Sequence, residues 1–341
     1  MSSQPRDSFR REPFQRDPAN PILTAGDLTW TANSVFNPGA TRLRSGEVGL
    51  LVRVEDRRGL SSIHLARSAN GRTGWKVDET PLLTPTPADF RSEWGFEDAR
   101  VSFVAEIDRY VITCTAYGPA GPCVYLATSD DLSSCTDGSV VLPPEDKNAA
   151  VFPRRIGGYW MMLHRPVVMA INSCDVWIST SDDLASWRDP QPVLLRRPIG
   201  WWDAARVGIG PPPLETEHGW LQVYHGVRTT MNGAIYRVGL SMLDLEQPWI
   251  ITHRLPEWVL SPAEPYERSG DVPNVVFPCG FVEDDGQYVL YYGAADSTVC
   301  RASAPLAALI EQVLQHPVMP ASISPPAHTS TPPHTPTPHG A

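Results

Sequence analysis

Charged and amide side chains stand next to one another at several points of this chain. Glu97 and Asp98 form one such pair, Lys147 and Asn148 form another, and Arg165 follows a histidine in the run LHRP. A carboxylic acid can protonate a leaving group, and clustered cations can hold an anion. Gathered in one pocket, these residue types would form a site for acid catalysis on a polar substrate.

Further polar and aromatic residues fall at equivalent positions when the strand-like runs of the chain are aligned. Each has a structural explanation by itself, since Asp203 or Asp271 can cap a turn. Likewise, Arg100 can pair with Glu97, and His225 can be a core histidine. The set as a whole favours a functional pocket, because its members would converge from separate segments. The aligned positions hold Asn33, Asn37, Glu97, Asp98, Lys147, Asn148, Trp202, Asp203, Asp271 and Asn274, with Arg53, Tyr117, His164, Arg165, Tyr224, His225, Tyr291 and Tyr292 on the strands that follow.

The runs themselves form a repeat. One type carries a polar pair or turn before small and apolar residues, as in FNPGATRL from Phe36 and EDARVSFV from Glu97. A more apolar run follows, and then a third type, as in VYLATSDDL from Val124 and VWISTSDDL from Val176. β-Branched and aromatic residues between Gly, Asp and Pro predict strands. The order recurs five times, roughly every 50 to 65 residues, which is typical of a propeller.

A fourth, outer strand follows in the first four units and is missing from the fifth, where residues 305–314 predict a helix. The run NPILTA, from Asn20, matches the outer-strand pattern but precedes the first unit. We therefore expect an all-β, five-bladed propeller whose last blade is completed by this N-terminal strand. A β-sandwich also has regularly spaced strands, but it does not predict one strand moved to the other end of the chain.

These patterns predict one folded domain of residues 20–314, including the C-terminal helix. Residues 1–19 are expected to be a flexible segment, and its first 16 residues should be dispensable. After Glu311 the chain has no charged residue, so residues 315–341 predict a disordered tail of Pro, Thr, Ser and His. Its histidines, His328, His334 and His339, are better explained as solvated side chains, and we expect no metal.

The composition is that of a soluble globular protein, with 42% hydrophobic and 19% charged residues. Its net charge of -10 argues against nucleic acid or an anionic membrane as a partner. No export signal is evident, and no segment approaches the roughly 18 apolar residues of a membrane span. The six scattered cysteines are therefore expected to be reduced thiols in a cytoplasmic protein, and not disulfides or zinc ligands.

Seven motifs in order make the chain similar to glycoside hydrolase family 130. The resemblance runs from about Asn20 to Ala304. It implies cleavage of β-mannosides, mostly by inorganic phosphate with inversion, which gives α-mannose 1-phosphate. Phosphate would then be a co-substrate, and no cofactor is implied. The motifs are FNPGA, EDAR from Glu97, KNAAVFPRRIGG, LHRP, the segment from Trp202 to GPPP, YHG and GDVPNVVFPCG.

The resemblance also implies roles for individual residues. Asp98 matches the acid of the family's E-D-x-R motif, which acts through the 3-hydroxyl of the sugar, and Glu97 and Arg100 would orient it. The family often carries Lys in place of Arg206 and can carry Arg in place of Lys147, which keeps the charge but changes the hydrogen-bond geometry. The implied phosphate-binding residues are Lys147, Arg165, Arg206 and His225, and the implied sugar-binding residues are Asn33, Ser34, Arg53, Asn148 and Asp271.

Phosphorolysis of a β-1,2- or β-1,4-linked manno-oligosaccharide is the favoured interpretation. An inverting hydrolase needs a second carboxylate about 6.5–9.5 Å from the acid to activate water, whereas a phosphorylase needs cations that hold phosphate. A β-mannosidase would have to use Glu215, Glu217 or Asp203, and the first two lie in the loop-like run PPPLETEHGW. A non-catalytic sugar-binding propeller is a second alternative, which the intact acid and cation set disfavours. The chain could also form a homo-oligomer.

Overall fold

The computed structural model describes residues 12–167 and 174–318 of the chain. Strands dominate, and within these ranges the helices are α1 (Pro265–Arg268), α2 (Leu306–Leu314) and a short 3-10 turn at Ala25–Asp27. The expected all-β class is therefore confirmed, and α2 is the helix expected near the C-terminus. None of the helices described is long and apolar enough to cross a membrane. The expected tail from residue 319 onward lies outside the described residues.

The strands form antiparallel groups of similar order. The largest sheet has eight strands in two antiparallel halves, which a single parallel bridge between Ser61 and Gly95 joins. Its halves are β2 (Ser34–Arg42), β3 (Val48–Glu55), β4 (Ser61–Ser68) and β5 (Lys76–Val77), then β6 (Gly95–Val104), β7 (Arg109–Tyr117), β8 (Cys123–Ser129) and β9 (Thr136–Leu142).

The remaining groups repeat this order. One sheet contains β10 (Asp146–Val151), β11 (Trp160–Pro166), β12 (Val176–Ser181) and β13 (Arg188–Leu194). The next contains β14 (Arg206–Ile209), β15 (Leu214–Thr216), β16 (Gly219–Thr230), β17 (Gly233–Leu243) and β18 (Ile251–Arg254). The last contains β19 (Val276–Asp284), β20 (Gln287–Ala294), β21 (Thr298–Pro305) and, beside β21, β1 (Gln15–Arg16).

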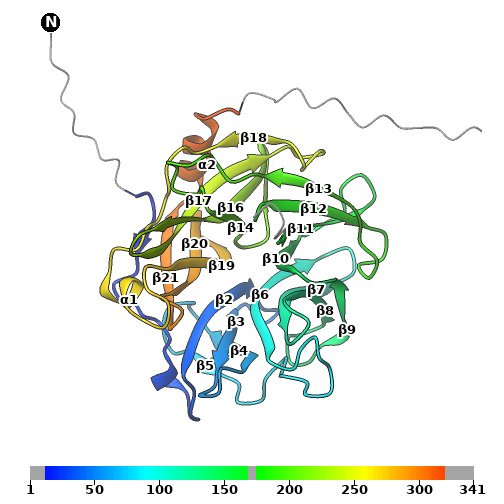
Figure 1. Ribbon diagram of the computed structural model, residues 1–341, viewed down its shortest axis with the longest axis vertical. Coiled ribbons are helices and arrows are strands. Elements are labelled where there is room, and N and C mark those ends of the chain that lie inside the picture. Colours follow the sequence, from blue (N-terminus) through cyan, green and yellow to red (C-terminus); the bar gives the residue numbers. More distant parts are fainter. Residues whose placement is uncertain (1–11, 168–173, 319–341) are drawn as a thin grey trace, which may run out of the picture.

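The first strand of each group lies nearest the centre of the molecule. Figure 1 shows β2, β6, β10, β14 and β19 around the middle of the view, with the later strands of each group further out. Most residues of β2 are buried on both faces, because neighbouring groups pack against its two sides. This arrangement brings residues from every group together at the centre, as the aligned repeat predicts.

Two predicted outer strands differ from the observed ones. The run from Thr80 contributes a bridge between Leu83 and Ile63, while the strand of that group is β5, a few residues earlier. The run from Glu257 similarly gives a bridge between Leu260 and Val238, and the strand is β18. In both cases apolar residues of the run are buried without forming a ladder. The apolar pattern therefore predicted which residues pack in the core, but not which residues form the outer strand.

The strand that completes the last group also differs from the prediction. It is β1, which pairs with β21 through Gln15 and Arg16, whereas NPILTA contributes an isolated bridge from Leu23 to Val299. The side chain of Arg16 binds the fully buried carboxylate of Glu267 at 2.8 Å. A two-residue polar strand has no alternating pattern, and so the expected flexible segment was extended too far into the chain.

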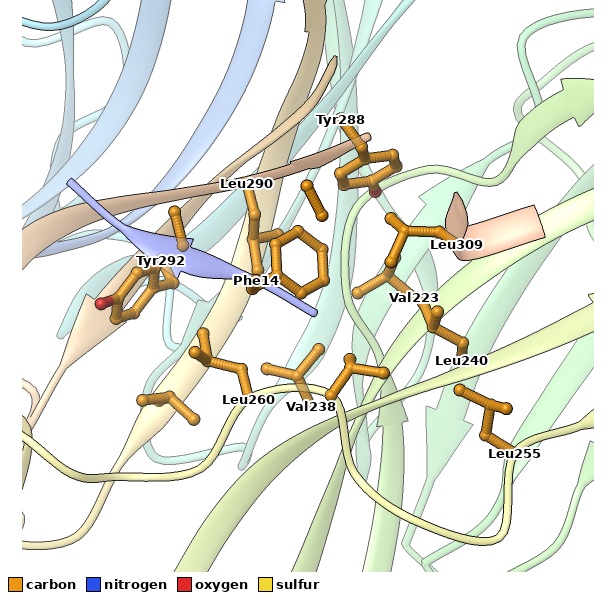
Figure 2. Close-up of a cluster of buried hydrophobic side chains, with 14 of the residues drawn as sticks. Phe14, Val223, Val238, Leu240, Leu255, Leu260, Tyr288, Leu290, Tyr292 and Leu309 are labelled. Carbon is orange, nitrogen blue, oxygen red and sulfur yellow. The ribbon is translucent and has the colours of Figure 1, made fainter. Parts of the chain in front are cut away.

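Phe14 shows why this N-terminal stretch is ordered. Figure 2 shows its ring within a hydrophobic cluster to which Leu240, Leu290 and Leu309 also belong. Its ring packs edge-on against Tyr288 with centroids 6.0 Å apart, and Phe14 is only 2% exposed. The expectation that residues 1–16 are dispensable is therefore contradicted for residues 14–16, since Phe14 fills a core, Gln15 and Arg16 pair with β21, and Arg16 binds Glu267.

Replacing Phe14 by Ala should remove this packing and leave a cavity. We expect the free energy of unfolding to fall by about 3 kcal/mol or more, as for other Phe-to-Ala changes in cores. Urea unfolding of wild type and Phe14→Ala measures the change. The matched control is Met231→Ala, because Met231 is fully exposed. Equal stability of the two variants would show that β1 does not anchor the fold.

Candidate active site

A polar cavity of about 180 Å³ lies among the inner strands, and each strand group contributes to its lining. Of the residues implied by the sequence, the catalytic candidate, all four phosphate-binding candidates and two sugar-binding candidates line it. These are Asp98, Lys147, Arg165, Arg206, His225, Arg53 and Asn148. The lining also includes Asn37, Glu97, Tyr236, Val272, Val275, Phe277 and Asp296.

The same backbone irregularity occurs where β2, β6 and β10 reach the cavity. In each strand, two residues oppose one on the neighbouring strand, so one residue is extra. Asn37, Asp98 and Asn148 stand within these bulges with φ of 46°, 52° and 53°. Asn and Asp tolerate this left-handed conformation better than other non-glycine residues. A bulge turns a strand residue out of the ladder, and here it presents an amide, a carboxyl and a second amide to one cavity.

Close packing around the bulges depends on glycine. A β-carbon on Gly293 would lie 1.8 Å from the side-chain oxygen of Asn37. A β-carbon on Gly208 would lie 2.4 Å from the ring of His225. These two positions therefore admit no larger residue without displacing a cavity side chain.

Asp98 is buried among donors that favour its ionised form. Its carboxylate accepts a hydrogen bond from the side-chain amide of Asn37 at 2.8 Å and a longer one from Arg53 at 3.4 Å. Burial raises the pKa of Asp98, but Arg53, Arg100 and the amide bond outweigh burial, so the pKa lies below its usual value. Asp98 is thus a carboxylate in the ligand-free protein at neutral pH.

Glu97 pairs with cations of two neighbouring groups. Its carboxylate lies 3.1 Å from the guanidinium of Arg53 and 3.9 Å from the amine of Lys147. Arg53 also contacts Glu55 at 3.1 Å and stacks over Phe36 at 4.6 Å from the ring centroid. Arg53 is consequently held by three carboxylates, counting Asp98, and fixes the acid from one side.

The opposite side of the cavity has cations without carboxylate partners. Among the described residues, no salt bridge joins Arg165 or Arg206 to an acidic side chain. Burial lowers the pKa of His225 far below its usual value, and Arg165 and other nearby cations lower it further. His225 is therefore neutral, and its Nε2 accepts a hydrogen bond from Arg165 at 3.2 Å.

This pairing leaves two buried donors unused. With Nε2 accepting, the proton of neutral His225 is on Nδ1, and neither that nitrogen nor Nε of Arg165 has a hydrogen-bond partner within the described protein. Burial also lowers the pKa of Arg165, and Arg206 contributes to the same effect. Unpaired buried donors beside like charges are costly, so the arrangement fits an anionic acceptor.

Three implied sugar-binding residues do not line the cavity but lie beside it. The side-chain amide of Asn33 donates to the carboxylate of Asp271 at 2.9 Å, and both side chains are exposed at that contact. Asp271 is joined through its N–H to Ser297, which follows the cavity residue Asp296. Ser34 is buried, and its hydroxyl has no partner within the described protein.

Comparison with known proteins agrees with this geometry. The profile of glycoside hydrolase family 130, described as beta-1,4-mannooligosaccharide phosphorylase, matches residues 12–315. The chain belongs to glycoside hydrolase family 130. It is therefore an enzyme of a family whose named relatives are mannoside phosphorylases.

Two relatives and one solved structure illustrate the similarity. The chain is 32% identical to a beta-1,4-mannooligosaccharide phosphorylase of Ruminococcus albus, over 87% of this chain and 90% of the relative. It is 36% identical to a 1,2-beta-oligomannan phosphorylase of Thermoanaerobacter, over 82% and 92%. A beta-1,2-mannobiose phosphorylase from Listeria innocua, solved with beta-1,2-mannobiose, superposes with a TM-score of 0.81 at 28% identity, over 89% of this chain and 99% of that chain.

Asp296 is a cavity residue of this family 130 enzyme that sequence reasoning did not identify. This residue follows β20 in a tight turn with φ of 50°, and it lines the cavity. Burial raises its pKa to about 7, with a further contribution from the nearby charge of Asp98. The run AADS between two apolar strands signals a turn, but only its position opposite β6 makes the carboxyl part of the site. Tyr236 and Phe277 were missed in the same way, because they read as ordinary strand residues.

Arg100 of the E-D-x-R motif does not pair with Glu97. Its guanidinium is buried, and it donates to the backbone carbonyl of Asp98 and more weakly to that of Gly210 at 3.3 Å. It also stacks over Phe277, 5.5 Å from the ring centroid. The pairing considered from the sequence is therefore wrong, although the residue still supports the acid, through its backbone.

Several aligned residues serve the framework and not the cavity. Asp203 is fully buried, and its carboxylate binds Arg197 at 2.9 Å and Arg254 at 2.7 Å. The hydroxyl of Tyr224 donates to the same carboxylate at 3.2 Å. His164 bonds Asp146 and Ser179, while Tyr291 and Tyr292 bond Gly71 and Glu267. The ring nitrogens of His164 and the hydroxyl groups of both tyrosines are therefore occupied by buried partners outside the cavity.

Glu215 lies at the other end of the inner strands. It is on β15, a strand where a loop was expected, and binds Arg154 at 2.8 Å. It lines a second cavity of about 330 Å³ together with Phe103 and Glu283, which stand near the far ends of β6 and β19. Glu217 is exposed beside His218. Within residues 12–167 and 174–318, no cluster of three or more His, Cys, Asp or Glu side chains is arranged to hold a metal ion.

The carboxyl of Asp296 should make stability depend on pH. The pKa of about 7 in the folded protein exceeds the ordinary value of 3.8. The carboxyl therefore contributes fully to the free energy of unfolding below about pH 4, and this contribution is lost as the pH rises to about 7. Asp296→Asn removes this loss. Relative to the variant, wild type should lose up to about 4 kcal/mol between pH 4 and pH 8.

Urea unfolding of both proteins across this range measures the difference. A matched Asp130→Asn change affects a carboxyl that is largely exposed, and it should keep the pH dependence of wild type. Parallel curves for wild type and Asp296→Asn would mean that the cavity does not hold a neutral carboxyl.

Proposed function

We propose that this enzyme is an inverting β-mannoside phosphorylase that converts a manno-oligosaccharide and inorganic phosphate into α-D-mannose 1-phosphate. Asp98 is the general acid in this proposal, and the cationic side of the cavity holds phosphate. The single observation that supports it most is the cluster of Arg165, Arg206 and His225, which has buried donors and, among the described residues, no carboxylate partner.

Phosphate suits these donors in charge and in geometry. Arg165 offers a guanidinium whose Nε–H is unused, and the neutral His225 offers an N–H beside it. Guanidinium groups bind phosphate oxygens through paired, charge-assisted hydrogen bonds. In the proposal, Arg206 and Lys147 complete the binding site, since both line the same cavity.

The same anion explains how Asp98 obtains a proton. In the free protein Asp98 is ionised, because the surrounding cations lower its pKa. A phosphate anion neutralises part of that positive field, which raises the pKa of a carboxyl in the same cavity. Phosphate binding therefore prepares the acid, and the acid protonates the leaving sugar through the 3-hydroxyl of the mannosyl unit.

Hydrolysis by water is less well supported. Of the three bases that it could use, Glu215 and Glu217 lie away from the cavity, and Asp203 is neutralised by two arginines. Of the other carboxyls in the cavity, Glu97 is paired with Arg53 and Lys147. Asp296, whose pKa burial raises to about 7, is the cavity carboxyl that a hydrolase would need as its base.

The sugar is proposed to lie between Asp98 and the rim of the cavity. Asn148 and Arg53 would bind its hydroxyls inside, while Asn33, Ser34 and Asp271 would bind them at the rim, since amide and carboxylate pairs discriminate between epimers. Relatives named for β-1,4- and β-1,2-linked substrates support a manno-oligosaccharide with either linkage. We also propose that the antiparallel groups are the blades of a five-bladed propeller that β1 closes, which would hold the cavity at its axis.

The product distinguishes the proposed reaction from its alternatives. With a β-1,4- or β-1,2-manno-oligosaccharide and phosphate, the enzyme should release α-mannose 1-phosphate, and Asp98→Asn should reduce turnover by about 10²- to 10⁴-fold. Chromatography and phosphorus NMR identify the product. Free mannose at an equal rate without phosphate would support a mannosidase, and no product with any mannoside would support a non-catalytic protein.

Arg165→Ala should weaken the binding of phosphate and not that of the mannoside. Loss of a paired charge-assisted contact should raise the KM for phosphate by about tenfold to a hundredfold, while the KM for the mannoside changes much less. Arg206→Lys should be milder because it retains the charge. Initial rates against phosphate concentration measure both effects, with the exposed Arg188→Ala as control. A wild-type rate that does not depend on phosphate would contradict the assignment.

A further inference from the structure

Two aromatic side chains are exposed where β6 begins and β7 ends, and they take no part in the proposed chemistry. Trp94 is 39% exposed and Tyr117 is 37% exposed. Their ring centroids are 5.1 Å apart, and the rings are nearly perpendicular at 75°. Large aromatic side chains more often bury their apolar surface, so an exposed pair beside a binding cavity indicates a binding surface.

The position of the pair follows from the direction of β6. Glu97 and Asp98 line the active-site cavity, whereas Val101 and Phe103, further along the same strand, line the second cavity. Trp94 directly precedes β6 and stands three residues before Glu97, which at about 3.3 Å per residue is about 10 Å along the strand. The pair therefore lies beyond the active-site cavity, at its outer rim.

The backbone holds the pair rigidly. The N–H of Trp94 donates to the carbonyl of Tyr117 at 2.9 Å, and its carbonyl accepts from the N–H of Ser61 at 3.1 Å. The hydroxyl of Ser61 in turn accepts a hydrogen bond from Nε of Arg53 at 2.9 Å, and Arg53 lines the cavity. A short chain of bonds thus fixes the aromatic pair relative to the site.

The size of the cavity indicates what the aromatic pair would bind. About 180 Å³ is below the roughly 300–1,000 Å³ typical of sites that enclose a drug-sized ligand, so a long oligosaccharide must extend past the rim. The apolar C–H faces of sugar rings pack on aromatic side chains, and Tyr and Trp combine such a face with a polar atom. An oligosaccharide leaving the cavity along β6 would meet this surface.

We propose that Trp94 and Tyr117 form a stacking platform for a sugar unit of the manno-oligosaccharide that lies outside the cavity, and that this platform sets a preference for chains longer than a disaccharide. The inference rests on the proposed function for the identity of the sugar. It assigns a role in chain-length selection to residues that do not touch the reacting atoms.

Kinetics with substrates of different length test the platform. Wild type should have a higher kcat/KM for the trisaccharide or tetrasaccharide than for mannobiose of the same linkage. Trp94→Ala should reduce this advantage by about fivefold to tenfold while leaving the disaccharide nearly unchanged. Tyr117→Ala should act in the same direction, and Trp94→Phe should restore most of the advantage because it keeps an aromatic face.

Phe103→Ala is the matched control. Phe103 stands near the other end of the same strand, is 38% exposed and packs edge-on against Tyr110 with centroids 5.2 Å apart. Its removal should not change the ratio between long and short substrates. Loss of activity in Trp94→Ala that is equal for all chain lengths would overturn the platform.

Direct binding separates this inference from the proposed reaction. Calorimetric titration with β-1,2- and β-1,4-linked mannobiose and mannotetraose requires no turnover. A preference for tetraose that Trp94→Ala removes would support the platform even if no phosphorolysis occurred. Wild type that binds tetraose no better than biose, for both linkages, would overturn the platform even if phosphorolysis were confirmed.

Discussion

The bulges in β2, β6 and β10 are the constraint on which the site depends. Each inner strand would otherwise alternate its side chains between two packed faces. One extra residue per strand, at Asn37, Asp98 and Asn148, turns the chain so that a polar side chain enters the cavity. All three positions require a left-handed backbone, which Asn and Asp adopt at little cost in free energy. The repeat thus supplies the same backbone device to three neighbouring strand groups.

The charges around this centre are unevenly distributed, and this asymmetry defines the chemistry. On the Arg53 side, the cations have carboxylate partners, and Asp98 is held in place as an anion. On the Arg165 side, cations and a neutral histidine have no anionic partner within the described chain. In the proposed reaction, an incoming phosphate supplies the missing anionic partner and raises the pKa of Asp98 in one step. Binding of the nucleophile and protonation of the acid are then coupled by the same field.

The two ends of the inner strands have different roles. One end carries the cavity with Asp98, and the other carries the second cavity with Glu215 and Phe103. Between them, Arg100 bonds the backbone of Asp98 and stacks on Phe277. The ion cluster of Asp203 with Arg197 and Arg254 lies apart from both and supports the segment that carries Arg206. Charged residues in shared motifs therefore divide into those that line the cavity and those that hold the segments in place.

The sequence by itself determined the all-β class, the repeated strand order and the grouping of Asp98, Lys147, Asn148, Arg165 and His225, because periodic apolar runs fix which residues share a position. The family resemblance, and not the repeat, added Arg206 to this group. It could not reveal that Gln15 and Arg16, and not Leu23, form the ladder beside β21, since two polar residues carry no period and their place depends on Phe14 and Glu267. Only the tertiary structure decided that Asp296 belongs to the cavity and that Asp203 and Glu215 do not. The physical reason is that the role of a carboxyl depends on its partners and on its burial. Both arise from segments that are distant in the chain.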